Sequence, residues 1–338
     1  MLRHLGRVFI SMLHVSEPYA KPFLSLQDQL ALLKSRGLKV ADDDSALACL
    51  HRNGYYRLSA YWYPFRKIVD RSKTDEFLEH SRFEDARRLY VFDKQLKLHL
   101  LDAIERVEIA MRVEIAMCLG NRDTFAHLKP EFFLSKFTAS NDKNEDCASN
   151  HEIWINKYQC AVTNSKDAFV KHHYDKFKDH LEKYGIAAQL PIWIAIELWD
   201  FGMLSKLYSG MLVEDCTCVA SRFEVPSWKV MSAWLHTLNY IRNVIAHHGR
   251  LWNLHLAIAP KSPAIGSMPG FDEVFSVDGN NRVYTICCIL SHFSKVINSE
   301  SEWGQELKKI IDDFPAMPHA NTSHMGFPNN WKAHRFCA

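Results

Sequence analysis

No stretch of this 338-residue sequence approaches the roughly 20 apolar residues that a membrane-spanning helix needs. We therefore expect no contact with a membrane. An excess of charge of one sign is also missing, because 41 lysines and arginines face 39 aspartates and glutamates and the net charge is only +2. A protein that binds nucleic acid over its whole surface is usually more basic. Any nucleic-acid contact should therefore be confined to a local patch.

The nine cysteines form no paired framework, since their number is odd and no C-x-x-C pair occurs. Such usage is typical of a reducing compartment, so we expect a cytoplasmic protein. The only clusters are Cys216-Thr217-Cys218 and Cys287-Cys288. A zinc site at the first would need a distant histidine, and neither cluster has the usual ligand spacing. No glycine-rich phosphate loop is present, so we expect neither a metal nor a cofactor.

Alternation typical of strands and internal repeats are missing too, whereas helical periodicity is widespread, which predicts an all-α fold. The longest run extends from Phe83 to Leu119 and is closed by Gly120. It exceeds an ordinary globular helix, so it should be kinked or form the long spine of a bundle. We expect further helices over 25–37, 42–50, 151–184, 190–208, 283–296 and 302–314, and loops over 66–81 and 260–281. The helix over 190–208 should have a break near its end, at Phe201-Gly202.

The stretch from Leu238 to Asn253 interrupts an apolar helical pattern with arginine, asparagine, two histidines and glycine. One broad apolar arc of this helix contains Trp228, Met231, Trp234, Leu235, Leu238, Ile241 and Ile245. Arg242 falls inside that arc, and a guanidinium there needs a partner, a ligand or a second subunit. Asn243 and His247 lie one turn apart on the other side. Gly249 is expected at the C′ position, which would place His247 in the last turn.

Arg242-Asn243-x-x-x-His247 resembles the R-N-x-x-x-H signature of HEPN-type ribonucleases, and the longer run RN-x-x-AHH-x-RLWN resembles the AbiD/AbiF group of bacterial abortive-infection proteins. Four other segments resemble elements of that group: YYRLS-x-YW-x-PF from Tyr55, AIER-x-E from Ala103, LPIW-x-x-IE…FG-x-LS-x-LY from Leu190, and MGFP-x-x-W before Lys332. The resemblance spans about Pro22 to Trp331.

This resemblance implies a HEPN-like helical bundle with an N-terminal helical extension. We divide the chain into a flexible leader over 1–21, a helical and aromatic RNA-contacting segment over 22–80, and a HEPN-like helical domain over 81–336. A polar insertion near 121–150 is expected to be flexible.

The resemblance also implies an RNA-cleaving toxin of phage defence, with Arg242, Asn243 and His247 as catalytic residues. Histidine carries protons near neutral pH, and arginine offers donors to phosphate oxygens, so no metal is required. In HEPN ribonucleases two signature helices meet in a composite site, which implies a homodimer. Some relatives work with a small non-coding RNA. We expect His248, Arg250 and Asn253 of the extended motif to contact RNA.

Aromatic residues and arginine interleave at Tyr55, Tyr56, Arg57, Tyr61 and Trp62. Such side chains can stack on unpaired bases and bind phosphates, so we expect RNA contacts here. The alternative is an aromatic core from which arginine extends outward.

Three charged residues are candidate supports of the site. Glu105 and Arg106 could reach Arg242 and His247, or they could form pairs on a solvated helix face. Glu197 lies in an apolar run, and Arg242 is its expected partner; otherwise it belongs to a core polar network. The lysines of 151–184 form either a backbone-binding surface or a solvated face.

Two other functions stay open. The chain could be a non-catalytic RNA-binding module, in which the signature helix and the 55–66 segment hold a partner RNA. Alternatively, Arg242 and His247 could be a satisfied structural pair in a plain helical bundle.

Overall fold

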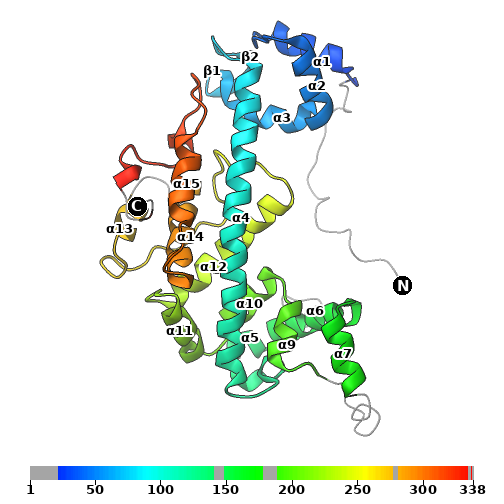
Figure 1. Cartoon of the computed structure of the whole chain (residues 1–338), viewed down its shortest axis with the longest axis vertical. Coiled ribbons are helices and arrows are strands. Elements are labelled where there is room, and N and C mark those ends of the chain that lie inside the picture. The colour runs from blue at the N-terminus through cyan, green and yellow to red at the C-terminus, as the bar shows by residue number, and fades with distance from the viewer. Residues whose placement is uncertain (1–21, 141–147, 178–188, 277–280, 334–335, 337–338) are drawn as a thin grey trace. The chain divides into compact units, whose positions relative to one another are not determined.

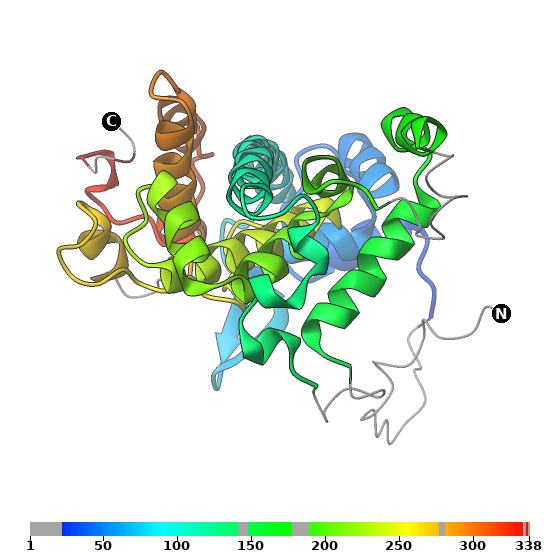
Figure 2. The same ribbon diagram turned by 90° about the horizontal axis from the view of Figure 1, so that it is seen from below.

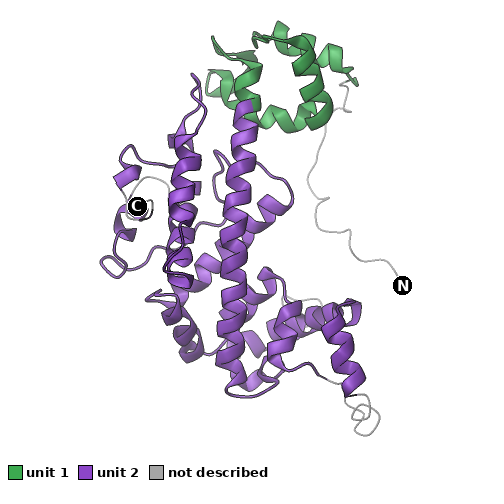
Figure 3. Ribbon diagram, in the orientation of Figure 1, with its two compact units in different colours: residues 1–87 green, residues 88–338 purple. Residues whose placement is uncertain are grey.

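The computed structural model describes residues 22–140, 148–177, 189–276, 281–333 and 336. The chain divides into two compact units, 1–87 and 88–338 (Figure 3). Apart from one two-stranded hairpin, the regular elements of the described residues are helices (Figure 1). The prediction of an all-α fold is therefore confirmed. None of the described helices is both long enough and apolar enough to cross a membrane. The leader over 1–21 lies outside the described residues.

The described residues of the first unit that precede α4 form three helices, a 3-10 turn and the hairpin. These elements are α1 (Leu26–Ser35), α2 (Asp43–Asn53), α3 (Tyr55–Trp62), η1 (Tyr63–Phe65), β1 (Arg66–Val69) and β2 (Ser72–Phe77). Ser25 caps α1 as expected, because its hydroxyl accepts the backbone N–H of Asp28 at 3.2 Å. Asp42 caps α2 in the same way through the N–H of Asp44.

The hairpin corrects our expectation of a loop over 66–81. Its antiparallel strands pair Arg66 with Phe77 and Val69 with Ser72. Asp70 and Arg71 form the two-residue turn, and both have positive φ, at 50° and 65°. Two left-handed residues match the twist of a hairpin. The usual Asn-Gly or Asp-Gly signal is missing here, so the sequence does not predict this turn.

A single 38-residue helix, α4 (Phe83–Gly120), runs without interruption. It is about 57 Å long at 1.5 Å per residue. Within the second unit its buried stripe consists of Leu89, Phe92, Leu96, Leu100, Ala103, Ile104, Val107, Met111, Ile115 and Leu119. Figure 1 shows this helix as the spine of the second unit, which supports the second of our two expectations for this run.

The other described helices of the second unit lie on both sides of α4 in the view of Figure 1, and Figure 2 shows them from below. They are α5 (Ser135–Thr138), α6 (Asn150–Asn164), α7 (Ala168–Lys176), α9 (Ile192–Ala195), α10 (Phe201–Gly210), α11 (Val213–Arg222), α12 (Trp228–Ala246), α13 (Phe271–Ser276), α14 (Val283–Ile297) and α15 (Trp303–Asp312). Short 3-10 turns are η2 (Ala126–Leu128), η3 (Pro130–Phe132), η4 (Ile196–Leu198), η5 (Thr322–Met325) and η6 (Trp331–Ala333).

The helix expected over 190–208 is interrupted, but the break lies just before the Phe201-Gly202 pair at which the sequence predicts it. The chain leaves the helical conformation at Trp199 and Asp200, and α10 begins afresh at Phe201. The Asp200 carboxylate caps this helix by accepting the backbone N–H of Met203 at 2.8 Å. The break places the Trp199 ring edge-on to Trp154, with ring centroids 4.7 Å apart. Trp199, the residue at which the helix breaks, is fully buried.

The expected flexible insertion near 121–150 is also partly wrong. Phe133 and Phe137 are buried, and the Phe137 ring packs so closely on Gly210 that a Cβ there would lie 2.5 Å from it. The polar residues 141–147, on which the expectation mainly rested, lie outside the described residues. The loop expected over 260–281 contains the short helix α13.

Candidate functional site

Helix α12 presents an apolar face to the core and a polar face to solvent. The buried residues include those of the predicted arc from Met231 to Ile245. This face packs against α10 and α11. Asn243 and His247 are exposed on the opposite side. The pattern of the signature helix is therefore as the sequence predicts.

The end of α12 is fixed by a pair of hydrogen bonds that reverse the chain. The backbone N–H of His248 donates to the carbonyl of Ile245 (2.9 Å), and that of Gly249 donates to the carbonyl of Val244 (2.8 Å). This is a Schellman motif, in which the C′ residue is left-handed. That residue is His248, with φ 58°, and not Gly249 as expected. His247 is the C-cap.

Glycine is required at position 249 by space. A Cβ there would lie 2.9 Å from Cγ1 and 3.0 Å from the carbonyl oxygen of Val244. His248, by contrast, has a left-handed backbone conformation, which is sterically unfavourable for a residue with a Cβ. The two positions together direct His247 and His248 outward, where both are exposed.

Arg242 is half-buried, between the apolar face and solvent. Its Nη1 lies 3.5 Å from Oδ1 of Asn243. Within the described part of the chain, no carboxylate lies within ion-pair distance of this guanidinium. Two carboxylates are near enough to feel its charge, namely those of Glu108 and Asp200. The N–H donors of the Arg242 guanidinium are therefore not engaged in a salt bridge with a carboxylate of the described residues.

The two neighbouring carboxylates differ in their environment. Burial raises the pKa of Glu108, although the charges of Arg112 and Arg242 oppose the shift. Burial also acts to raise the pKa of Asp200, but a hydrogen bond from Lys157, the N–H of Met203 and the charges of Lys157 and Arg242 outweigh it and lower the pKa. Asp200 is therefore the more firmly ionised of the two.

The expected pair between Glu197 and Arg242 does not form. Glu197 is about half exposed, and its Oε2 accepts from Nη1 of Arg112 at 3.3 Å. Arg112 also donates to Oε1 of Glu108 and to the carbonyl of Trp199, both at 2.8 Å. The 3-10 turn η4 and the break at Trp199 turn Glu197 toward α4. Glu197 thus belongs to a network centred on Arg112.

Glu105 and Arg106 both lie on the exposed face of α4. Arg106 pairs with Asp102 at 3.0 Å, one turn earlier on the same helix, as the solvated-face alternative describes. On the same helix, Glu108 is near enough to Arg242 to feel its charge, and Arg112 pairs with Glu108. Their spacing of four residues indicates only a pair on one helix face, whereas both are half-buried in the folded chain.

A buried ion pair on α4 holds the segment that follows α12. Oδ1 of Asp93 accepts the backbone N–H groups of Leu251 (3.1 Å) and Trp252 (2.6 Å). Lys97 pairs with Asp93 at 3.2 Å and donates to the carbonyl of Gly249 at 3.1 Å. Neither Asp93 nor Lys97 is among the site residues that the sequence predicts. The signal was two charges, four apart, beside the apolar stripe of α4.

The remaining residues of the extended motif divide between core and surface. Trp252 is fully buried. Asn253 has φ 53°, and its Oδ1 accepts from Nη1 of Arg282 at 3.4 Å. Arg250 is half-buried, and only His248 among the predicted RNA contacts of this segment is exposed.

In the first unit, the predicted RNA-contacting aromatics separate into two groups. Tyr61 and Trp62 are buried, at 2% and 0% exposure, so they have no ring face for a base and the prediction is wrong for them. Tyr55 is half-buried, and its ring packs edge-on to Trp62 with centroids 5.3 Å apart. Tyr56 is 91% exposed, and Arg57 beside it is exposed. The apolar spacing of α3 places Leu58, Tyr61 and Trp62 inward.

The comparison with protein families gives a clear result. The family model described as Abi-like protein matches residues 48–253, more than half of the chain. The chain therefore belongs to the Abi-like protein family, and the expected family is confirmed. The match begins in α2 and ends at Asn253, the last residue of the extended signature; the MGFP-x-x-W segment lies beyond it. No curated protein and no solved structure matches the chain.

Proposed function

We propose that this Abi-like protein acts in antiphage abortive infection as a metal-independent HEPN-type endoribonuclease, with Arg242, Asn243 and His247 as its catalytic residues. Family membership supports the defence role. The observation that carries the chemistry is the end of α12. His247 is exposed one turn beyond the exposed Asn243, and Oδ1 of Asn243 lies 3.5 Å from the guanidinium of Arg242, which forms no ion pair with a carboxylate of the described residues.

These three residue types suit cleavage by the 2′-hydroxyl of RNA. The hydroxyl oxygen attacks the adjacent phosphorus while an imidazole accepts its proton. The bond from phosphorus to the 5′-oxygen breaks, and a second acid protonates that leaving oxygen. The products are a 2′,3′-cyclic phosphate and a free 5′-hydroxyl. Arg242 would stabilise the charge on the phosphorane oxygens, and Asn243 would orient an imidazole or an oxygen.

A homodimer with a composite site would supply the second histidine. An exposed apolar stripe on α4 supports this part of the proposal. Ile109, Val113 and Met117 recur every four residues and are 52%, 54% and 70% exposed. They lie on the helix that also carries Glu108, whose carboxylate is near enough to Arg242 to feel its charge. Apolar side chains of this extent are often covered by a partner.

The decisive experiment compares His247→Ala with wild type and with His255→Ala, which removes an exposed histidine outside the signature. Each purified protein is incubated with total RNA, and the fragment ends are sequenced. We expect fragments with 2′,3′-cyclic phosphate ends from wild type and His255→Ala only. Equal fragments from a folded His247→Ala protein would remove the assignment.

The dimer is tested by the double variant Val113→Asp/Met117→Asp, measured by light scattering and RNA cleavage. Charges on the stripe should yield a folded monomer that does not cleave. A wild-type protein that cleaves as a monomer would exclude the composite site.

The second candidate function is a non-catalytic RNA-binding module of a defence ribonucleoprotein. It is favoured by Tyr56 and Arg57, which lie exposed in a different unit from the signature. This function predicts salt-sensitive RNA binding that survives His247→Ala, no cleavage by wild type, and one co-purifying small non-coding RNA. Sequencing of the nucleic acid extracted from purified protein separates it from the ribonuclease.

A further inference from the structure

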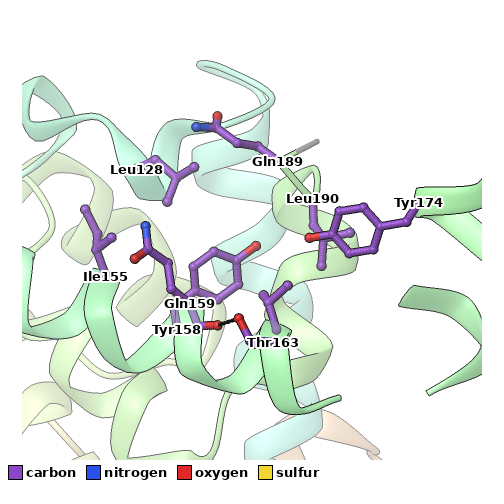
Figure 4. Close-up of a pocket in the computed structure, with 9 residues that line it drawn as sticks. Leu128, Ile155, Tyr158, Gln159, Thr163, Tyr174, Gln189 and Leu190 are labelled. Atoms are coloured by element: carbon purple, nitrogen blue, oxygen red, sulfur yellow. Dashed lines mark hydrogen bonds between the residues drawn. The ribbon is translucent and has the colours of Figure 1, made fainter. Parts of the chain in front are cut away.

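The cavities of the second unit differ in chemistry. One of about 470 Å³ lies between α6 and α7 and is lined by neutral side chains, among them Tyr158, Gln159, Thr163 and Tyr174 (Figure 4). Another, of about 660 Å³, lies between α4 and α11. Its walls carry acidic and basic groups together, and Arg122 there pairs with Asp215 at 2.7 Å. Neither has an excess of positive charge available to an anion.

A third cavity, between α10 and α12, does have such an excess. This groove has a volume of about 500 Å³ and is lined by Gly202, Ser205, Lys206, Ser209, Lys229, Ser232, Ala233, His236 and Asn239. Its lining combines two lysines with hydroxyl, amide and imidazole groups. These are the donors that proteins commonly use to bind phosphate. The carboxylate of Asp200 adjoins the lining at Gly202 and is paired with Lys157.

The two lysines are available to a ligand. Lys206 and Lys229 are both exposed. Each lies over an aromatic ring: Lys206 is 5.9 Å from the centroid of Phe137, and Lys229 is 5.7 Å from that of Trp228. Among the described residues, no carboxylate forms an ion pair with either lysine. Their charges are therefore not neutralised within the groove.

The face of α12 that lines the groove continues toward the signature. Its residues on this helix are Lys229, Ser232, His236 and Asn239, and the same spacing of three or four residues leads on to Asn243 and His247. Residues so spaced share one face of a helix. None of the six is buried. From Lys229 to Asn243 the face extends about 21 Å at 1.5 Å per residue, long enough for several nucleotides.

We propose that the groove between α10 and α12 binds the sugar-phosphate backbone of single-stranded RNA on one side of the phosphate that is cleaved. That the bound strand is also cleaved rests on the proposed ribonuclease function. That the groove binds RNA rests on the groove alone. Lys206 and Lys229 contact phosphate oxygens, and Ser232, His236 and Asn239 donate to phosphates or ribose hydroxyls. Contacts of this kind fix the position of the strand and do not read its sequence.

The test uses the full chain carrying His247→Ala, so that RNA is bound and not cut. The affinity for a fluorescent single-stranded RNA of mixed sequence is measured over a series of salt concentrations. The groove variant is Lys206→Gln/Lys229→Gln. Its control is Lys308→Gln/Lys309→Gln, which removes the same charge from α15. Ser232→Glu, which adds a carboxylate to the groove, is the second groove variant.

We expect both groove variants to bind RNA more weakly than the control, with unchanged unfolding temperature. Loss of two phosphate contacts should reduce the slope of log K against log salt by about 1.4, at about 0.7 for each contact with a single strand. With His247 restored, the groove variants should cleave long RNA more slowly and a dinucleotide at the rate of wild type, because a dinucleotide does not extend into the groove.

The two proposals fail in different ways. RNA affinity and salt dependence equal to those of the control would overturn the groove, even if His247-dependent cleavage is found. Weaker binding by the groove variants, with no cleavage by wild type, would retain the groove as an RNA site and remove the ribonuclease.

Discussion

The carboxylate of Asp93 accepts the backbone N–H of Trp252 at 2.6 Å, although the two residues are 159 positions apart. Asp93 is fully buried, and its second oxygen pairs with Lys97. The link fixes the segment after α12 to α4 and thereby fixes the position of the helix end that carries His247.

Asp93→Ala should destabilise the second unit strongly. The substitution leaves the buried Lys97 ammonium and two backbone N–H groups without this acceptor, a change that typically costs about 3–5 kcal/mol. Urea unfolding gives the value. The control is Asp102→Asn on the same helix, whose pair with Arg106 is about half exposed and should cost about 0–1 kcal/mol. Similar losses for both would show that the buried pair has no special structural role.

Gly249→Ala and His248→Gly should change stability in opposite directions. The new Cβ at 249 meets the side chain and backbone of Val244, and overpacking of this kind costs about 1–3 kcal/mol. Glycine at 248 relieves a left-handed backbone that costs about 1–2 kcal/mol in a residue with a side chain. Thermal unfolding of both variants checks the signs. A stable Gly249→Ala protein would contradict the steric argument.

His127 should make the protein sensitive to acid. Its ring is fully buried beside Trp154, Tyr158 and Trp199, and within the described residues neither ring nitrogen has a hydrogen-bond partner. Burial, with a smaller effect of His151, lowers its pKa from 6.5 to about 3. Between these values the unfolded chain binds one proton more than the folded one. The free energy of unfolding therefore falls by about 1.4 kcal/mol for each pH unit below 6.5.

His127→Phe should remove this contribution. Unfolding measured from neutral to mildly acidic pH should show a slope smaller by one proton, because phenylalanine fills the aromatic site and does not titrate. His172→Phe, at an exposed histidine of α7, should leave the slope as in wild type. An unchanged slope in His127→Phe would mean that this ring is not the acid-sensitive group.

Trp62→Ala and Tyr56→Ala separate core from surface in the first unit. Removal of the fully buried Trp62 should cost about 3–5 kcal/mol. Tyr56 is 91% exposed, so its removal should change stability by no more than about 0.5 kcal/mol. Urea unfolding tests both. If Tyr56 stacks on a base, its variant should also bind single-stranded RNA more weakly, with a loss of about 1–3 kcal/mol.

Features set by local periodicity could be predicted from the sequence. The bounds of α1, α4 and α14 and the two faces of α12 depend on apolar spacing and caps, which neighbouring residues determine. The partners of charged residues could not. Glu197 pairs with Arg112 and not Arg242 because the chain breaks at Trp199, a break that depends on packing against Trp154. Asp93 likewise finds Trp252 only through the folded arrangement of α4 and α12.

The tight turn at Gly249 also affects how genetic data on this protein should be interpreted. In a survival screen of random substitutions, Gly249 and Asp93 would score as intolerant as His247, although their contacts lie within the protein. A map of intolerant positions would thus mark a continuous region from α4 to the end of α12. Only measurements on folded, purified variants would distinguish the residues that do chemistry from those that hold the helix end in place.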